Sequence, residues 1–162
     1  MAVREAPITV SRDIERDYPG ADHRATACVI NLLRTENLVS HRLSAALRPY
    51  DLTPATFNVL MILRGAGEAL CPWQIGERLL VTRGTVTGLL DSLEKRGLIT
   101  RVPHADDRRM LTIEISPAAE ELLDELLPGF FAGEVEMMGA LGAREKETLV
   151  RLLGKVQAHI QG

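Results

Sequence analysis

Aromatic residues and cysteines are scarce in this chain of 162 residues. Phe, Trp and Tyr together make up 4% of it, and the only cysteines are Cys28 and Cys71. With so few aromatic rings, the core must be built mainly from Leu, Ile, Val and Ala, a composition that favours helices. Two cysteines so far apart in the sequence do not make the framework of a disulfide-rich secreted domain.

Long hydrophobic runs are lacking as well. No apolar stretch approaches the roughly 20 residues that a membrane-spanning helix needs. The first residues mix both charges and contain no apolar region of the kind found in secretory signals. The composition, 46% hydrophobic and 25% charged, is that of one domain with a substantial core. We expect a cytoplasmic protein.

Sequence patterns that mark catalysis are also missing. The chain has no Gly-rich phosphate loop, no Gly-x-Ser-x-Gly turn and no Cys-x-x-Cys pair. The histidines do not pair with another His, Cys or carboxylate at metal-ligand spacing; they are His23, His41, His104 and His159. We therefore expect no enzyme activity, no metal site and no cofactor.

The stretch from Leu70 to Ser116 indicates a short helix, a tight turn, a second helix and a two-stranded ribbon. Pro72 suits the first position of a helix, where a missing backbone N–H costs nothing. Thr82 can cap the next helix, and Gly97 suits its left-handed end. This order of elements is a helix-turn-helix followed by a wing.

The second helix, predicted over 82–96, has one apolar stripe and one polar face. The stripe recurs at helical spacing and consists of Val86, Leu89, Leu90 and Leu93. The exposed first turns carry small or donor-rich residues: Arg83, Gly84, Thr85 and Thr87. Arginine can pair with guanine O6 and N7, and threonine can bond a base edge, so this face suits a major groove. Taken alone, the helix is equally consistent with an ordinary solvated polar face.

The ribbon adds to the DNA-binding interpretation. Strands are predicted over 98–102 and 110–115, the second with Leu, Ile and Ile alternating with polar residues, as in a half-buried strand. The tip between them includes Arg108 and Arg109, which can reach phosphates or a narrow minor groove. The alternative is a solvated charged turn.

Three runs resemble the MarR family of winged helix-turn-helix regulators: Val-Thr-Arg-Gly-Thr-Val-Thr at 81–87, Leu-Glu-Lys-Arg-Gly-Leu-Ile at 93–99 and Asp-Arg-Arg at 107–109. The family's wing motif is Asp-x-Arg followed by a hydrophobic strand, and Asp107 and Arg109 match it. The resemblance implies that Arg109 sits at the wing tip near the minor groove and that Asp107 helps to hold the wing. It covers roughly residues 25 to 160.

The charge distribution permits DNA binding although the net charge is −3. From Gly76 to Arg109 there are seven basic and five acidic residues, so this segment is +2 and the remainder −5. Binding requires a local basic patch rather than a basic protein. Because this patch is modest, we expect affinity to depend on two subunits and to fall with salt.

Helical patterns flank the winged segment. The sequence predicts an N-terminal arm over 1–20, disordered or packed on a partner, and a single domain over 21–162. In that domain, helices at about 22–48 and 117–161 form a dimerisation lobe around a winged helix-turn-helix at about 53–115. The C-terminal part is predicted as a long helix to Leu141, kinked at Pro128, and a last helix from about Ala143. Their excess apolar surface suggests a partner surface, and the fold class is mainly α with a small β-ribbon.

These features give a first hypothesis: a homodimeric repressor that binds a roughly palindromic operator. The predicted DNA contacts are Gln74, Arg78, Arg83, Gly84, Thr85, Thr87, Arg101, Asp107, Arg108 and Arg109. The resemblance further implies release by a small phenolic or anionic molecule, and the residues that could line its pocket are Asn37, His41, Arg42 and Asn58.

Two alternatives stay open. The resemblance extends to peroxide-sensing members with a reactive cysteine near the position of Cys28, although burial of an inert cysteine is the commoner case. A winged helix that binds another protein instead of DNA is also compatible with the acidic total charge.

Overall fold

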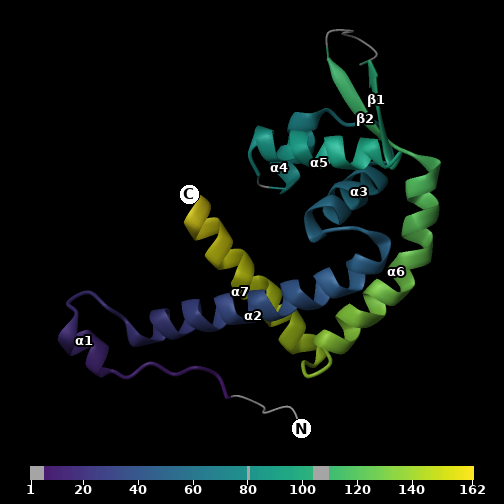
Figure 1. Cartoon of the computed structure of the whole chain (residues 1–162). Coiled ribbons are helices and arrows are strands. Elements are labelled where there is room, and N and C mark those ends of the chain that lie inside the picture. The colour runs from purple at the N-terminus through teal and green to yellow at the C-terminus, as the bar shows by residue number, and fades with distance from the viewer. Residues whose placement is uncertain (1–5, 80, 104–109) are drawn as a thin grey trace. The chain divides into compact units, whose positions relative to one another are not determined.

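The computed structural model describes residues 6–79, 81–103 and 110–162 (Figure 1). The chain divides into two compact units, Met1–Ala45 and Ala46–Gly162. In the described ranges, no helix is both long and apolar enough to cross a membrane.

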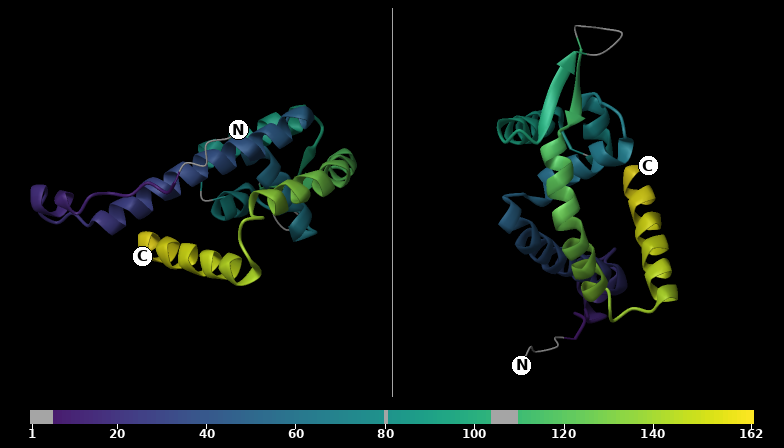
Figure 2. Two further views of the ribbon diagram at one scale, coloured as in Figure 1. Left: turned by 90° about the horizontal axis from the view of Figure 1, so that it is seen from below. Right: turned by 90° about the vertical axis from the view of Figure 1, so that its right-hand side faces the viewer.

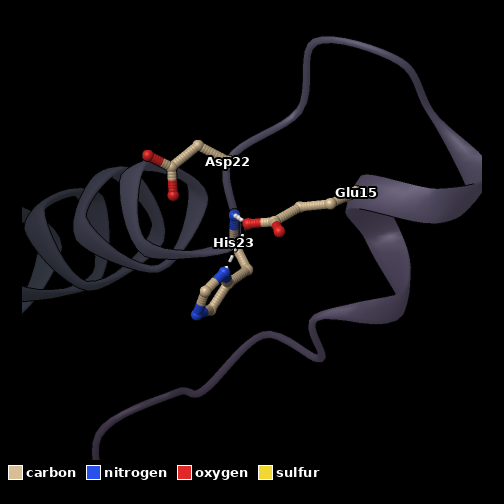
Figure 3. Close-up of side chains that lie close together, drawn as sticks. All are labelled: Glu15, Asp22 and His23. Carbon is tan, nitrogen blue, oxygen red and sulfur yellow. Dashed lines mark hydrogen bonds and ion pairs between the residues drawn. The ribbon is translucent and has the colours of Figure 1, made fainter.

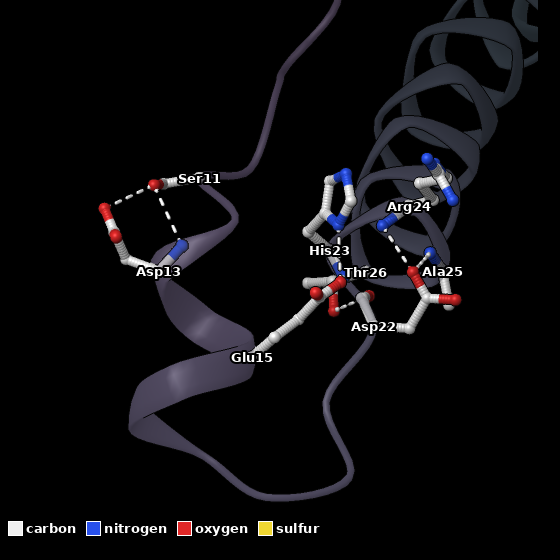
Figure 4. A network of polar contacts seen from close by, with 8 residues as sticks. All are labelled: Ser11, Asp13, Glu15, Asp22, His23, Arg24, Ala25 and Thr26. Atoms are coloured by element: carbon white, nitrogen blue, oxygen red, sulfur yellow. Dashed lines mark hydrogen bonds and ion pairs between the residues drawn. The ribbon is translucent and has the colours of Figure 1, made fainter.

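The first unit holds a short helix, α1 (Asp13–Asp17), and most of a long one, α2 (His23–Leu47). The predicted helix at 22–48 is thus confirmed. The Ser11 hydroxyl accepts the backbone N–H of Asp13 at 3.2 Å, and the Asp22 carboxylate accepts that of Arg24 at 2.7 Å (Figure 4). Both helices therefore begin at a side chain that satisfies a free N–H group.

The arm before α1 folds back onto α2. The side-chain amide of Asn31 accepts the backbone N–H of Ile8 at 3.0 Å, and it donates to the carbonyl of the same residue at 2.8 Å. The described residues of the N-terminal segment are thus held against α2 of the same chain.

The second unit begins with a 3₁₀ turn, η1 (Arg48–Tyr50), and helix α3 (Pro54–Ala66). Thr53 caps α3 by accepting the N–H of Thr56 at 3.1 Å, and Pro54 fills the first helical position. Gly67 ends the helix with φ of 66°, a left-handed conformation that glycine adopts without strain.

The winged helix-turn-helix follows as predicted: α4 (Pro72–Leu79), α5 (Arg83–Lys95), β1 (Ile99–Pro103) and β2 (Leu111–Ile115). The strands pair antiparallel, with Ile99 opposite Ile115 and Pro103 opposite Leu111. Leu70 exchanges two backbone hydrogen bonds with Ile113, which anchors β2 beside the start of α4. The ribbon extends away from α3, α4 and α5 (Figure 1, Figure 2).

The predicted alternation along β2 is correct at Ile113, which is fully buried, and wrong at Leu111, which is 47% exposed. Thr112 is buried instead, and its hydroxyl donates to the Val102 carbonyl at 3.3 Å. Leu111 pairs with Pro103 at the outer end of the ribbon, beyond the helices that cover Ile113. A two-stranded ribbon can bury a face only where a helix lies against it.

The last two helices are α6 (Pro117–Met137) and α7 (Ala143–Gln161). Ser116 caps α6 by accepting the N–H of Ala119 at 3.1 Å, and the helix continues through Pro128. The predicted extension to Leu141 is wrong. A tight turn ends α6 earlier, where a Cβ at Gly139 would lie 3.1 Å from the Glu136 carbonyl.

The core of the second unit is formed by α3, α4, α5, β2 and the first half of α6. Its fully buried side chains are mostly aliphatic, as expected, and include Leu60, Leu63, Ile75, Leu90, Leu93, Ile113 and Leu123. The rings of Phe57 and Phe130 meet with centroids 4.5 Å apart. Arg64 of α3 binds Asp124 of α6 at 2.5 Å, so these two helices lie side by side. The helix-turn-helix therefore shares one core with α3 and the first half of α6.

Candidate nucleic-acid interface

The start of α5 presents a polar face opposite a buried one. Val86, Leu90 and Leu93 are buried, whereas Arg83 and Thr87, one turn apart, are exposed. Among the described residues, the Arg83 guanidinium has no ion-pair or hydrogen-bond partner. An exposed, unpaired guanidinium on a helix held by its opposite face is available to an external acceptor.

The threonines of this face are partly engaged within the helix. Thr82 caps α5 by accepting the N–H of Thr85 at 3.3 Å, and the two hydroxyls lie 3.0 Å apart. The Thr87 hydroxyl donates to the Arg83 carbonyl at 3.1 Å. These bonds fix the side chains, and the hydroxyl oxygens of Thr85 and Thr87 each keep a lone pair free to accept a hydrogen bond.

Two glycines leave part of the exposed face of α5 without projecting side chains. A Cβ at Gly88 would meet nothing within 4 Å, and one at Gly84 would meet only the Thr82 hydroxyl, at 4.0 Å. Packing within the chain therefore does not require glycine at either position, so they leave room for a molecule outside. Gly76 of α4 differs, because its Cβ would lie 3.1 Å from Val86. This glycine, which sequence reasoning did not single out, sets the close approach of α4 to α5.

Helix α4 holds two of the predicted DNA contacts. The Gln74 side-chain oxygen accepts the backbone N–H of Cys71 at 2.7 Å, so Gln74 caps its own helix. Its NH₂ group is still a donor. Arg78, one turn later, is exposed and has no partner in the described part of the chain.

Arg101 on β1 is differently placed. Its guanidinium binds Asp91 at 2.5 Å and Glu94 at 2.6 Å, and the side chain is 25% exposed. The residue was predicted as a DNA contact, and in the structure its two ion pairs tie the ribbon to α5. The other predicted contacts of the wing, Asp107, Arg108 and Arg109, lie outside the described residues.

Comparison with known proteins matches residues 50–110 to the model of the MarR family. An uncharacterized helix-turn-helix-type transcriptional regulator of Bacillus cereus strain ZK is 30% identical over 131 residues, 80% of this chain and 86% of the relative. The transcriptional repressor YetL of Bacillus subtilis is 29% identical over 138 residues, 85% and 83% of the two chains. The chain belongs to the MarR family.

Among solved structures, a mutant MarR from E. coli, complexed with operator DNA, is similar to this MarR-family chain. It has a TM-score of 0.70 and 27% identity, covering 90% of this chain and 99% of that one. The predicted fold class is thereby confirmed: a mainly helical winged helix-turn-helix with a two-stranded ribbon. The protein is a transcriptional regulator, as the three sequence runs predicted.

The residues predicted for an effector pocket are divided between the two units of this MarR-family protein. Asn37, His41 and Arg42 lie on α2 in the first unit, and Asn58 lies on α3 in the second; all four are exposed. Cys28, the candidate redox residue, is a free and exposed thiol on α2, whereas Cys71 is buried before α4.

One cluster escaped the sequence analysis. The His23 ring and backbone N–H bind the Glu15 carboxylate at 2.6 and 3.2 Å, and the Asp22 carboxylate lies beside them (Figure 3). The His23 ring, and then its N–H, hold the pKa of Glu15 below its usual value. The N–H groups of Arg24 and Ala25 do the same for Asp22. Both carboxylates are thus used to start α2 and to fasten α1. Glu15 and His23 are eight residues apart on either side of a turn, and this separation matches no sequence pattern that would predict their contact.

Proposed function

We propose that this chain is a homodimeric, DNA-binding repressor whose two α5 helices enter successive major grooves. The observation that carries the proposal is Arg83, which has no partner among the described residues and lies on the exposed start of a capped helix with a buried opposite face. Such a helix has the form of the recognition helix in helix-turn-helix proteins. The two-fold symmetry of the dimer calls for half-sites about one helical turn, roughly 10 bp, apart.

The residues divide by role in this proposal. Arg83 reads guanine, while Thr85 and Thr87 contact neighbouring base edges and Gly84 allows the close approach. Gln74 and Arg78 bind phosphates. Arg101 contributes indirectly, because it holds the ribbon against α5. Asp107 and Arg109 keep the roles in the wing that the family resemblance implies, and Arg108 binds phosphate.

Exposed apolar surface supports pairing with a second copy. Helix α7 has no buried residue, and its apolar side chains stand 40–77% exposed at Leu149, Val150, Leu152, Val156 and Ile160. On α2, Leu33 and Leu38 are 57% and 64% exposed. Monomeric proteins rarely leave so many large apolar side chains of one helix in water. We assign these helices to the dimer interface, as in the dimerisation lobe predicted from the sequence.

We further propose that a small phenolic or anionic effector releases the operator, with Asn37, His41, Arg42 and Asn58 as candidate contacts. The relatives are named as regulators, and we propose no catalytic activity.

Selection of bound duplexes from a random DNA pool, at near-physiological salt, tests the proposal. Enrichment of a palindrome with half-sites about 10 bp apart is expected. Absence of enrichment from a preparation shown to be dimeric by sedimentation would contradict it and favour the protein-interaction alternative.

A further inference from the structure

The only tryptophan of the chain stands on the surface of the helix-turn-helix. Trp73 is the second residue of α4 and is 49% exposed. Val81, Met110 and Leu111 are 38%, 40% and 47% exposed. In a chain with few aromatic residues, the largest ring thus lies outside the core, close to the predicted DNA-binding face of α5.

Two hollows of about 410 and 430 Å³ share the wall formed by Pro72, Trp73, Arg83 and Val86. The first is completed by residues of α4 and the turn, and the second by Thr87 of α5 together with Met110 and Leu111. The indole therefore borders the same space as Arg83 and Thr87. This continuity places it at the edge of the surface that we assign to DNA.

The chemistry of this wall fits a sugar-phosphate strand. Indole and aliphatic side chains offer an apolar surface for a deoxyribose ring, and the indole Nε1–H is a donor for a phosphate oxygen. The backbone N–H of Trp73 lies in the first turn of α4, where the helix dipole favours an anion. Arg83 adds positive charge to both hollows, and Glu77 is the one acidic residue of the first hollow. A purely apolar protein partner would not use these donors.

We propose that Trp73 packs on the sugar-phosphate backbone beside the major groove that α5 enters, and that this contact adds affinity. The inference rests on the proposed function and deepens it. The contact carries no sequence information, because every nucleotide has the same sugar and phosphate.

Two consequences separate this contact from that of a cationic side chain. Trp73→Ala should weaken binding to selected and random duplexes by a similar factor, roughly tenfold if the contact is worth as much as aromatic stacking on a nucleic acid. Because indole is neutral, the slope of log affinity against log salt should not change. Arg78→Ala should lower that slope by about one. Trp73→Phe, which keeps a ring but loses the N–H, should fall between Trp73→Ala and the unaltered chain.

Fluorescence of the unaltered protein gives a direct test, because Trp73 is its only tryptophan. Acrylamide quenching is measured with and without a saturating duplex, while the anisotropy of a labelled duplex reports binding independently. Protection of Trp73 by DNA is expected. Tyr18→Ala, which removes an aromatic ring 68% exposed in the first unit, serves as the control and should bind with unaltered affinity.

The outcomes are distinguishable. Binding of the duplex with undiminished quenching, together with unaltered affinity of Trp73→Ala, would overturn the role of Trp73 and leave the proposed function standing. Protection that grows with protein concentration in the absence of DNA would assign the surface to self-association and also overturn it. If no duplex binds at all, both the inference and the proposed function fail.

Discussion

Two arginines of the winged unit have opposite surroundings. Arg83 is exposed and unpaired among the described residues, whereas Arg101 is 25% exposed and binds two carboxylates. The same residue type therefore serves two purposes, one directed outward and one within the fold. Substituting each of them should separate recognition from stability.

Arg83→Ala should relax sequence discrimination without destabilising the fold. If Arg83 reads guanine, the preference at one base pair should fall by about 1–3 kcal/mol. Competition between operators altered at single positions measures this loss, and the denaturation midpoint should stay unchanged. An equal loss on specific and random DNA would show that Arg83 contacts only the backbone.

Arg101→Ala should instead reduce stability. It leaves Asp91 and Glu94 facing one another without their cation, and part-exposed pairs of this kind contribute about 1 kcal/mol or less each. Urea denaturation measures the effect, with Arg83→Ala as the matched arginine control. Unchanged stability, with a loss of DNA affinity and a shallower salt dependence, would return Arg101 to the role of a phosphate contact.

At the scale of single residues, the sequence predicts contacts between residues that are close together in the chain. Thr82 is confirmed as the cap of α5, because a cap bonds to an N–H three residues later. The sequence does not predict the partners of Arg101, because these depend on how β1 lies against α5. For the same reason, the sequence does not predict the contact of His23 with Glu15.

Among the elements, α5 depends most on its first residue. Thr82→Ala removes the cap, and we expect a loss of about 1 kcal/mol in the free energy of unfolding together with weaker DNA binding. The binding loss arises because Arg83 and Thr85 belong to the turn that would fray.

Hydrogen exchange at the start of α5 and urea denaturation measure the two effects of Thr82→Ala. Thr82→Ser keeps the hydroxyl and should restore both properties. Restored stability with DNA binding still lost would mean that the Thr82 methyl group itself contacts DNA.

The contact between α1 and α2 should respond to acid. The pKa of Glu15 is lowered in the folded chain, so the unfolded chain binds this proton more readily. The contact therefore stabilises the arm fully above the usual Glu pKa of about 4.3, and the stabilisation is lost as pH falls through the lowered value. Asp22, lowered by the N–H of Arg24, adds a change of the same sign.

Amide exchange of the arm, followed from about pH 6 to pH 3, measures this release. Glu15→Gln should open the arm already at neutral pH and flatten its acid response. An arm that stays protected at pH 3 in the unaltered chain would refute the role of the carboxylate.

The ribbon shows where element-level prediction stops. Both strands were placed within a residue, and Ile113 was correctly expected inside. Leu111 was not, because alternation says which residues share a face and not how far along that face a helix covers.

For the whole molecule, the sequence predicted an excess of apolar surface, and α7 carries it. The sequence did not predict what covers that surface, because the hydrophobic pattern of one chain does not specify its partner. Leu152→Glu, in the exposed stripe of α7, should dissociate the proposed dimer and weaken operator binding steeply, since each half-site alone contributes only part of the affinity.

Sedimentation velocity and operator titration of Leu152→Glu test this expectation. Lys155→Glu, also exposed on α7, changes a charge without placing one in the apolar stripe and should stay dimeric. A dimeric Leu152→Glu would place the interface elsewhere.

The Asn31 amide has a consequence for how the N-terminal arm can vary. Besides the Ala27 carbonyl of its own helix, it engages the N–H and carbonyl of Ile8, groups that nearly every amino acid carries. At Ile8 the arm is therefore held through its backbone and not through its side chain. Most replacements at Ile8 should be silent, whereas inserting one residue before Asp22 would offer Asn31 a different peptide unit and shift Glu15 away from His23.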